Sequence, residues 1–407
     1  MNCRHCHSPL EHVFVDLGFA PPSNAYRTRE QLRSPETYLP LRVYVCENCW
    51  LVQTDDYTDA TALFDAEYAY FSSTSSSWLA HAAQYTRDVI QRLSLDANSL
   101  VIEVASNDGY LLKNFVAAGI PCLGIEPTAS TATAAEGLGI PVLREFFGEA
   151  LARRLASEGR QADLIVGNNV YAHVPDINDF TRGLKAALKP GGTITLEFPH
   201  LMQLIKNTQF DTIYHEHFSY LSLGTVSRIF ESAGLKVFDV QVLATHGGSL
   251  RVFGCHAADA RSINASVGNV LTEESSSGLR SLDTYMSFQG LADRLKNELL
   301  GFLLEQKRLG KKVAAYGAAA KGNTLLNYAG IKPDLLPFVC DAAPAKQGKY
   351  LPGSHIPILS PETLDAFLPD YLLILPWNLA EEIAAEHRRL RQAHTQFVIA
   401  APTLKVL

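Results

Sequence analysis

The fold of the largest part of the chain is decided by Leu100-Val101-Ile102-Glu103-Val104-Ala105-Ser106-Asn107-Asp108-Gly109. Its first half is apolar except for one acid, as in a buried strand, and its second half consists of small and polar residues. The pattern over residues 110–118 then predicts a helix. A buried strand, a tight turn and a helix begin a doubly wound α/β sheet, in which ligands bind beyond the carboxyl ends of the strands.

Further strands are expected after this unit, with helical stretches between them. They lie at residues 122–125, 142–143, 162–167 and 193–198. The alternation of strands and helices predicts a parallel sheet. Glu126 closes the second strand about 20 residues after the glycine turn, a position at which an acid holds a ribose diol in nucleotide-binding folds.

The turn at residues 105–109 indicates the kind of ligand. It lacks the G-x-G-x-x-G spacing of a dinucleotide site, and its acid and amide side chains suit a cationic ligand better than a diphosphate. S-adenosylmethionine has an adenosine and a sulfonium but no phosphate. The order E-x-A-x-N-D-G, I-E-P, L-I-V-G-N-N and P-G-G-T resembles class I S-adenosylmethionine-dependent methyltransferases, with Ala105 and Asn107 in place of the first two glycines.

Length and composition limit the broad class. A chain of 407 residues is too long for one ordinary core, so two to three domains are expected. The net charge of −7 argues against nucleic-acid binding. The amino terminus has no apolar signal region and the chain has no apolar run of about 18 or more residues, so a cytoplasmic protein without a membrane span is expected.

Two CxxC pairs predict a metal site in a small β-rich module. They are Cys3 with Cys6, and Cys46 with Cys49. Four thiolates suit tetrahedral zinc and leave no open position, so the zinc would be structural. A redox pair is the alternative, but one pair would suffice for that and neither has a thioredoxin-like context. Possible substitute ligands are His5, His7 and His12.

The densest group of proton-handling side chains is Tyr214-His215-Glu216-His217-Phe218-Ser219-Tyr220. It precedes a helix-like run at 223–233 and is therefore expected in a loop or turn, where catalytic groups tend to lie. Histidine is the usual general base near neutrality, and a carboxylate can orient it. A structural histidine cluster and an exposed polar turn remain alternatives.

Two small-residue motifs follow. Thr245-His246-Gly247-Gly248-Ser249-Leu250-Arg251 is either a backbone approach to a polar ligand or a hairpin turn. A second α/β unit starts near residue 312, and its first strand enters Gly317-Ala318-Ala319-Ala320-Lys321-Gly322-Asn323-Thr324. A small-residue loop with a lysine at a helix amino terminus is a natural phosphate cradle. Asp341 closes the second strand of this unit as Glu126 does in the first.

We therefore expect an α/β protein with a small zinc-binding module, a class I methyltransferase domain of Rossmann-like type and a second Rossmann-like domain. The expected boundaries are 1–75, 76–255, a helical connector at 256–300, and 301–407.

The whole chain resembles a known family, the S-adenosylmethionine-dependent C-methyltransferases that act on nucleotide-linked keto-deoxysugars, and especially their C-3 methyltransferases. The resemblance rests on the CxxC pairs, the histidine stretch and the two small-residue motifs quoted above. It implies a dTDP-linked sugar lying between the central and rear domains, with the cofactor in the central one.

Carbon methylation requires loss of a proton beside a ketone, so a base and a donor at the ketone oxygen are needed. We assign His217 as the base, Tyr214 as the donor and Glu216 as the residue that orients the site, with His173 facing the pocket. The expected cofactor residues are Glu103, Ala105, Asn107, Asp108, Glu126, Phe147 and Asn169, the last two from the resemblance alone. The expected substrate residues are Tyr68, His246, Ser249, Arg251, Lys321 and Asn323.

Two other functions remain open from sequence. One is an NAD-dependent sugar-nucleotide oxidoreductase or epimerase, against which the missing glycine fingerprints count. The other is a zinc-bearing protein that binds sugar nucleotides without turnover, against which the histidine stretch counts. A monomer or weak homo-oligomer is expected.

Overall fold

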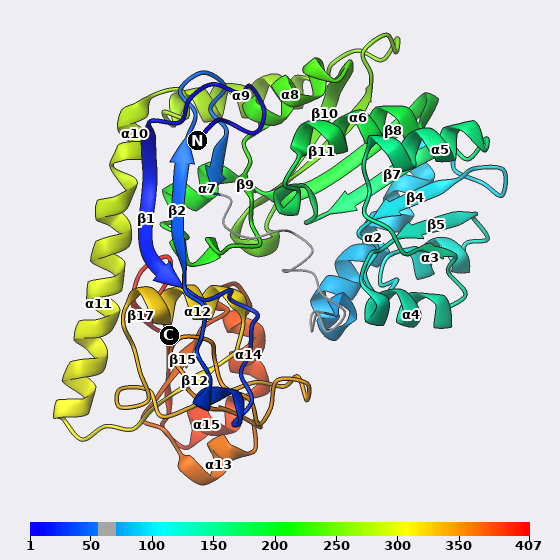
Figure 1. The fold of residues 1–407 in the computed structure, drawn as a ribbon. Helices are drawn as coiled ribbons and strands as arrows, with labels where there is room; N and C mark the ends of the chain where they lie inside the picture. The colour runs from blue at the N-terminus through cyan, green and yellow to red at the C-terminus, as the bar shows by residue number, and fades with distance from the viewer. Residues whose placement is uncertain (56–70) are drawn as a thin grey trace.

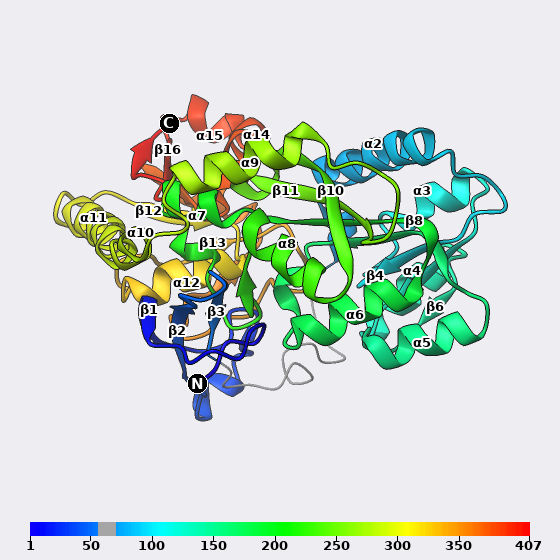
Figure 2. The same cartoon turned by 90° about the horizontal axis from the view of Figure 1, so that it is seen from above.

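The structure is a computed structural model of the 407-residue chain, and it describes residues 1–55 and 71–407. The described residues form sheets of four, seven and six strands. The seven-stranded sheet lies on one side of the molecule, and the six-stranded sheet with the long helix α11 (Phe288–Arg308) lies on the other (Figures 1 and 2).

The seven-stranded sheet has the order β10-β11-β8-β7-β4-β5-β6. Its strands are β4 (Val101–Val104), β5 (Cys122–Ile125), β6 (Val142–Leu143), β7 (Ala162–Asn168), β8 (Leu188–Pro199), β10 (Leu235–Leu243) and β11 (Ser249–His256). All pairs are parallel except those made by β11. This order, with its one reversed strand, confirms the predicted class I methyltransferase fold.

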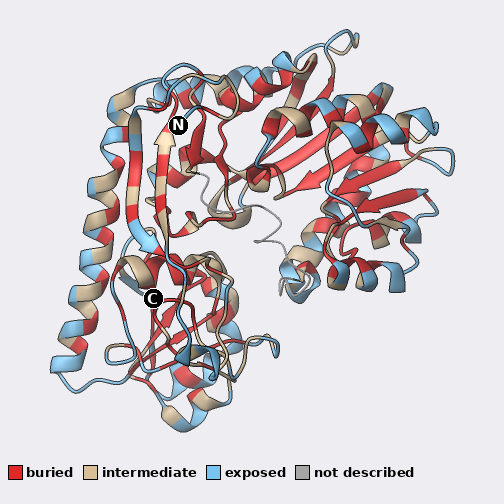
Figure 3. Cartoon of the chain, in the orientation of Figure 1, coloured by how far each residue is buried: buried red, intermediate tan, exposed pale blue. Residues whose placement is uncertain are grey.

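Helices cover both faces of this sheet. Residues of α2 (Ser76–Leu93), α3 (Leu112–Ala117) and α4 (Ala129–Gly137) pack in one apolar cluster with the sheet. Residues of α5 (Glu149–Ser157), α6 (Ile177–Ala187) and α8 (Leu223–Ser232) pack in another. The strands between them are buried along most of their length (Figure 3), because both of their faces lie against helices.

The four-stranded front sheet is built from distant parts of the chain. It has the order β1-β2-β3-β9, with β1 (His12–Ala20), β2 (Leu39–Val45), β3 (Val52–Thr54) and β9 (Ser219–Tyr220). In the last pair Val52 lies opposite Tyr220 and Gln53 opposite Ser219. The histidine stretch therefore ends inside the sheet of the cysteine module.

The rear sheet has the order β14-β13-β12-β15-β16-β17. Its strands are β12 (Val313–Tyr316), β13 (Val339–Cys340), β14 (Ile358–Leu359), β15 (Tyr371–Ile374), β16 (Gln396–Ile399) and β17 (Lys405–Val406), and its helices are α12 (Ala320–Tyr328), α13 (Thr363–Phe367), α14 (Ala380–Glu386) and α15 (Arg388–Gln392). Only β17 runs antiparallel to its neighbour. This is the second Rossmann-like unit that was predicted.

The front sheet and the rear unit share one apolar core. Helices α9 (Ala265–Ser276) and α10 (Leu282–Met286) lead into α11, and the ring of Phe288 stacks on that of Phe14 with centroids 4.5 Å apart. The same cluster includes buried side chains of β12 and α12. Burial of this extent fixes the rear unit against the front sheet.

Short elements at the carboxyl edges of the sheets complete the architecture. They are α7 (Leu201–Lys206), η3 (Tyr171–His173), η4 (Phe210–Thr212), η5 (Thr245–Gly247) and η6 (Trp377–Leu379), with η1 (Gln31–Arg33) and η2 (Ser72–Thr74) nearer the amino terminus. No helix within the described residues is long and apolar enough to cross a membrane.

Candidate active site and zinc centre

The two cysteine pairs come together in one cluster. Their four Sγ atoms lie within 4.8 Å of one another, and Cys3–Cys49 and Cys6–Cys46 are each 3.5 Å apart. Ligands about 2.3 Å from a tetrahedral zinc ion lie roughly 3.8 Å from one another, so the donor set and its spacing fit zinc. The cluster contains no histidine, and the structure does not support substitute ligation by the nearby histidines.

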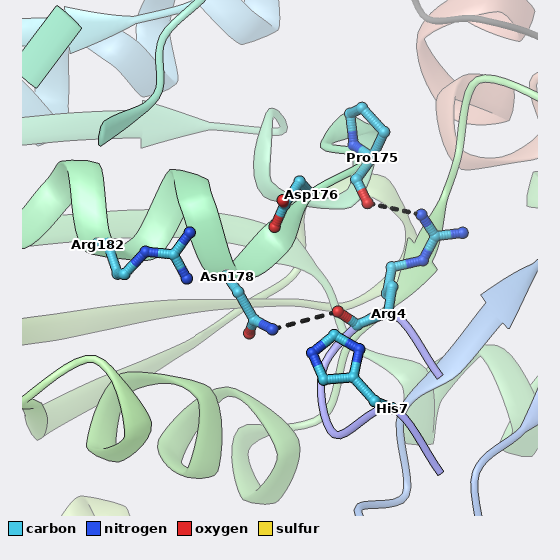
Figure 4. A pocket seen from close by; sticks show the side chains of 6 residues that line it. All are labelled: Arg4, His7, Pro175, Asp176, Asn178 and Arg182. Atoms are coloured by element: carbon cyan, nitrogen blue, oxygen red, sulfur yellow. Dashed lines mark hydrogen bonds between the residues drawn. The ribbon is translucent and has the colours of Figure 1, made fainter. Parts of the chain in front are cut away.

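The loop of the first cysteine pair also contacts the domain of the seven-stranded sheet through a polar surface hollow (Figure 4). The Nη1 of Arg4 donates to the carbonyl of Pro175 at 2.8 Å, and the Nδ2 of Asn178 donates to the carbonyl of Arg4 at 3.2 Å. His5 does not face the metal, because its Nδ1 lies 2.8 Å from the Oδ1 of Asn178. The cysteine module is thus tied to the segment that follows His173.

The turn after β4 has the geometry that the sequence predicted for a ligand-binding loop. Ala105, Asn107 and Gly109 have φ values of 56°, 49° and 77°, in the left-handed region that favours glycine. The backbone N–H of Asn107 donates to the Oε2 of Glu126, and that of Thr128 donates to its Oε1, both at 2.9 Å. The carboxylate of Glu126 is therefore held at the carboxyl edge of the sheet with a fixed orientation.

Three carboxylates gather beside this turn. Burial raises the pKa of Glu103 well above its usual range, and the charges of Asp108 and Glu126 raise it further. Neither oxygen of Glu103, nor the Oδ1 of Asp108, accepts a hydrogen bond of good geometry from the residues that the structure describes. The charges of Asp108 and Glu126, together with the unused Oδ1 acceptor of Asp108, fit a cationic ligand such as S-adenosylmethionine.

Asn169 and His246 lie side by side at the same edge. The Nδ2 of Asn169 donates to the Nε2 of His246 at 3.0 Å, while its Oδ1 is buried without a described partner. The ring of Trp78 on α2 lies 5.2 Å from that of His246. Asn169, which is predicted to bind the cofactor, and His246, which is predicted to bind the substrate, are thus in direct contact.

Phe147 is partly buried, and its expected place near the adenine of the cofactor stays a prediction. Its ring packs edge-on against Phe180 of α6 with centroids 5.1 Å apart, so it belongs to the helix-covered face of the sheet. The preceding residue, Phe146, is 50% exposed.

One ring nitrogen of His217 is bound to the backbone, and the other is turned away from it. Its Nδ1 donates to the carbonyl of Thr212 at 2.8 Å, so the lone pair is on Nε2. The rings of Tyr214 and His173 lie 4.0 and 4.6 Å away between centroids. Burial lowers the pKa of His217 well below its ordinary value of 6.5, and the neighbouring His173 lowers it further. The imidazole is therefore neutral at neutral pH.

His173 is anchored in the same manner. Its Nδ1 donates to the backbone carbonyl of Glu216 at 2.7 Å, and burial lowers its pKa to about 4. Two neutral imidazoles and a phenol thus share one space between η3 and η4. Such a group can remove a proton and stabilise a developing oxyanion.

The carboxylate of Glu216 does not reach His217. It accepts from the Nδ2 of Asn24 at 2.9 Å, and burial raises its pKa to about 7. His215 also faces the front sheet, where its Nε2 lies 3.2 Å from the carbonyl of Pro40. The expected role of Glu216 in orienting the site stays a prediction, and the contact that the structure shows is made by its backbone carbonyl, which holds His173.

Lys321 reaches the histidine site from the rear unit. Its Nζ donates to the Oδ1 of Asn378 at 2.6 Å and lies 4.8 Å from the ring centroid of Trp377. Its charge depresses the pKa of both His217 and His246. The ammonium lies against Trp377, whose indole also closely approaches Gly247, the residue after His246.

The rear loop is only partly open to a phosphate. The backbone N–H of Ala318 donates to the Oδ2 of Asp341 at 2.7 Å, so this amide is already used. Asn323 is 1% exposed and donates to the carbonyl of Ser23 at 2.6 Å, so it joins the rear unit to the front module. Its expected place at the substrate is not what the structure shows.

Ser249 and Arg251 are likewise internal. The Oγ of Ser249 donates to the carbonyl of Thr245 at 2.9 Å. The Nη2 of Arg251 lies 2.5 Å from the Oε2 of Glu197, and its guanidinium stacks 4.4 Å from the ring centroid of Tyr85. These contacts use both side chains to build β8, β11 and α2 together. Tyr68, the remaining expected substrate residue, lies outside the described residues.

The sequence did not point to several polar residues at this site. Glu197 is fully buried and accepts from the Nε2 of His81 on α2, at 3.0 and 2.9 Å from its two oxygens. Asp211 is fully buried and accepts from the Nε1 of Trp377 at 2.7 Å. The position of Asp211 directly before the histidine stretch was the one available signal.

Three protein families match the chain in succession. Residues 3–64 match the family described as "Putative zinc binding domain", residues 78–240 match "Methyltransferase domain", and residues 244–402 match "C-methyltransferase C-terminal domain". Together they cover the cysteine module, the seven-stranded sheet and the rear unit.

A curated protein matches over the full length. The C-methyltransferase NovU of Streptomyces niveus is 35% identical over 405 residues, which are 100% of this chain and 96% of that protein. Among solved structures, an S-adenosylmethionine-dependent methyltransferase from Clostridium acetobutylicum ATCC 824 matches 44% of this chain and 92% of its own, at 11% identity and a TM-score of 0.36. Magnesium protoporphyrin IX methyltransferase from Synechocystis PCC 6803 matches 44% and 80%, at 14% identity and a TM-score of 0.33.

Proposed function

Because the chain belongs to the C-methyltransferase family, uses S-adenosylmethionine and carries a structural zinc site, we propose that it methylates a ring carbon of a nucleotide-linked keto-deoxysugar. The finer assignment is C-3 of a dTDP-linked 4-keto sugar. A carbon beside a ketone becomes nucleophilic only after it loses a proton, so the site must supply a base and an oxyanion stabiliser.

The observation that carries this proposal is the arrangement around His217. Its Nδ1 is fixed on the carbonyl of Thr212, so its Nε2 holds the lone pair that a base needs. The depressed pKa keeps this nitrogen unprotonated at neutral pH. In the proposal Tyr214, whose ring lies against that of His217, donates to the ketone oxygen as negative charge develops there.

S-adenosylmethionine, when bound, supplies an electrophilic methyl group on a sulfonium. In the proposal Glu126 holds the ribose hydroxyls, and Glu103 and Asp108 stabilise the cationic end of the cofactor. The unused carboxylate oxygens beside the turn support this assignment. Ala105 and Asn107 contribute backbone groups to this cofactor site. Asn169 contributes its side-chain amide at the same edge of the sheet.

We also propose the functional division 1–75, 76–255, 256–300 and 301–407. In this division the second unit binds the cofactor, and the rear unit binds the nucleotide end of the substrate. One element crosses the division, because β9 of the second unit pairs with β3 of the first.

Replacing Glu126 by Ala should weaken S-adenosylmethionine binding by about 1–3 kcal/mol, the usual cost of losing a buried charged hydrogen bond. Isothermal calorimetry measures this directly. Glu126→Gln retains an acceptor for part of the loop's backbone N–H groups and should lose less affinity for the cofactor. Glu158→Ala, which removes an exposed carboxylate paired with Arg160, is the matched control and should bind normally. Unchanged affinity in Glu126→Ala would mean that another acid binds the ribose of the cofactor.

Replacing Lys321 by Ala should raise the KM for the sugar nucleotide while leaving the dissociation constant of S-adenosylmethionine unchanged, because its ammonium faces the substrate side of the site. Lys311→Ala, which removes an exposed lysine paired with Asp370, is the control and should leave both constants unchanged. A variant that loses cofactor binding but keeps its substrate KM would contradict this assignment.

The proposed function itself is tested by turnover of a panel of nucleotide-linked 4-keto and 3,4-modified deoxysugars with methyl-labelled cofactor. NMR locates the label on the product. Label on a ring carbon beside the ketone supports the proposal, and label on oxygen or nitrogen contradicts it. Comparison of dTDP-linked with UDP-linked substrates tests the nucleotide assignment.

A further inference from the structure

Asp211 is a buried carboxylate with an incomplete set of partners. It lies on η4, is 0% exposed, and its Oδ2 accepts from the Nε1 of Trp377 at 2.7 Å. Its Oδ1 accepts no hydrogen bond from any residue in the described ranges. A charged oxygen is costly to bury without a partner, so a specific role near this position is expected.

Trp377 connects Asp211 to two parts of the site. The Nζ of Lys321 lies 4.8 Å from its ring centroid. Gly247 lies on another side, where a Cβ atom would come within 2.3 Å of the Cη2 of the indole. The motif is the turn of the β10–β11 hairpin, and its first glycine after His246 is required by the close approach of Trp377.

Asp211 and Lys321 meet at the same indole, because the Nε1 of Trp377 donates to the Oδ2 of Asp211 at 2.7 Å and the ammonium of Lys321 lies 4.8 Å from the ring centroid. The amide of Asn378 and the indole of Trp377, which contact the ammonium, are both uncharged, and the titratable groups that interact electrostatically with it are Asp211, His217 and His246. Burial lowers the pKa of Lys321, and the charge of Asp211 raises it. Burial lowers the pKa of both histidines and keeps them neutral at neutral pH, so Asp211 is the one negatively charged group of the three.

Helix α12 and the histidine stretch are joined directly. The Oγ1 of Thr324, one turn after Lys321, donates to the carbonyl of Ile213 at 2.7 Å. The Nε2 of Gln209 donates to the carbonyl of Gly247 at 2.9 Å. Lys321, Asp211 and the backbone beside His246 are therefore held in fixed relation by hydrogen bonds.

We propose that Asp211 is a positioning residue that keeps Lys321 charged and fixed beside His217 and His246, where the ammonium binds an anionic oxygen of the substrate. The proposal rests on the proposed function for the identity of that substrate. The oxygen has two possible sources, the diphosphate or the enolate. A diphosphate oxygen is bound before the reaction, whereas the enolate charge develops during it.

Asp211→Asn tests the proposal, because an amide oxygen can still accept from the indole of Trp377 while the negative charge is removed. The alkaline limb of the kcat/KM profile requires charged Lys321 and should move to lower pH. If the alkaline limb shifts by about one pH unit, kcat/KM of the variant should be about ten-fold below that of the wild type at pH values above the alkaline limbs of both proteins. Asp334→Asn, which removes an exposed carboxylate paired with Lys307, should leave the profile unchanged.

The kinetic constants distinguish the two sources of the oxygen. A loss confined to KM identifies a diphosphate oxygen, and a loss confined to kcat identifies the enolate oxygen. Both results support a charged Lys321 held by Asp211. A profile identical to that of the wild type would overturn the proposal and leave Asp211 as an anchor for Trp377 alone.

A second measurement needs no substrate. The rate of acetylation of Lys321 by acetic anhydride, followed by peptide mass spectrometry across pH, reports its pKa in the folded chain. The midpoint should fall in Asp211→Asn and stay in place in Asp334→Asn, and an unmoved midpoint in Asp211→Asn would contradict the proposal. If the wild type turned over no nucleotide-linked keto sugar, the proposed function would fail while this labelling still tested Asp211.

Discussion

Replacing His217 by Asn should lower kcat by about 10²–10⁴-fold, the usual contribution of a general base, while both ligands still bind. Asparagine offers an N–H donor in place of Nδ1–H but has no basic nitrogen at the position of Nε2. In the wild type the pKa of His217 is held well below 6.5 by burial. The acid limb of the kcat/KM profile should therefore lie below that of an ordinary histidine, because activity is lost only when falling pH protonates the base.

Removal of the proton beside the ketone can be measured separately from methyl transfer. In heavy water without cofactor, wild-type exchange of the proton beside the ketone should be abolished in His217→Asn. Tyr214→Phe should lose less in both measurements, since solvent or another donor can partly replace the phenol. His12→Asn, remote from this group and paired with Glu47, is the control. Near-normal turnover by His217→Asn would reject the assignment, and His173 would be the next candidate.

Replacing Cys46 by Ser should reduce zinc to well under one ion per chain and lower the melting temperature. Structural zinc supplies about 10–16 kcal/mol of apparent binding free energy in small zinc-folded peptides, which is comparable with the ~5–15 kcal/mol stability of whole domains. Cys3, Cys46 and Cys49 also pack in the same apolar cluster as the seven-stranded sheet. Loss of the metal should therefore reduce methyl transfer as well as stability.

Elemental analysis and thermal unfolding measure these effects. Cys122→Ser makes the same chemical change at a buried cysteine of β5 outside the metal cluster, and it should keep a full zinc complement. A wild-type protein that contains neither zinc nor another metal at this cluster would contradict the assignment.

Local patterns predicted most of the fold. The strand at 101–104 and its polar turn are continuous in sequence, and so are the alternating strands and helices after them. The pairing of β9 with β3 has no local signal, because two residues are too few to show a strand period. The shared core of the front sheet and rear unit depends on packing that periodicity does not report.

The site was predictable where its parts are neighbours in sequence. Tyr214 and His217 are three residues apart and lie together. The direction of the Glu216 carboxylate has no sequence signal, because adjacent residues in a turn can face opposite directions, and it faces Asn24. Trp377 and Asn378 come from the end of the chain, and no local pattern places them beside Lys321.

The pairing of β9 with β3 has a consequence for building chimaeric enzymes from relatives. A swap that exchanged only the amino-terminal zinc module would leave Tyr220 of one parent facing a foreign residue in place of Val52, three positions after the proposed base. Recombination should therefore succeed when the exchanged DNA carries the codons for β9 together with those for β3, although more than 160 positions separate them in the gene. Crossover libraries scored for zinc content and methyl transfer would show whether the two segments are inherited as one unit.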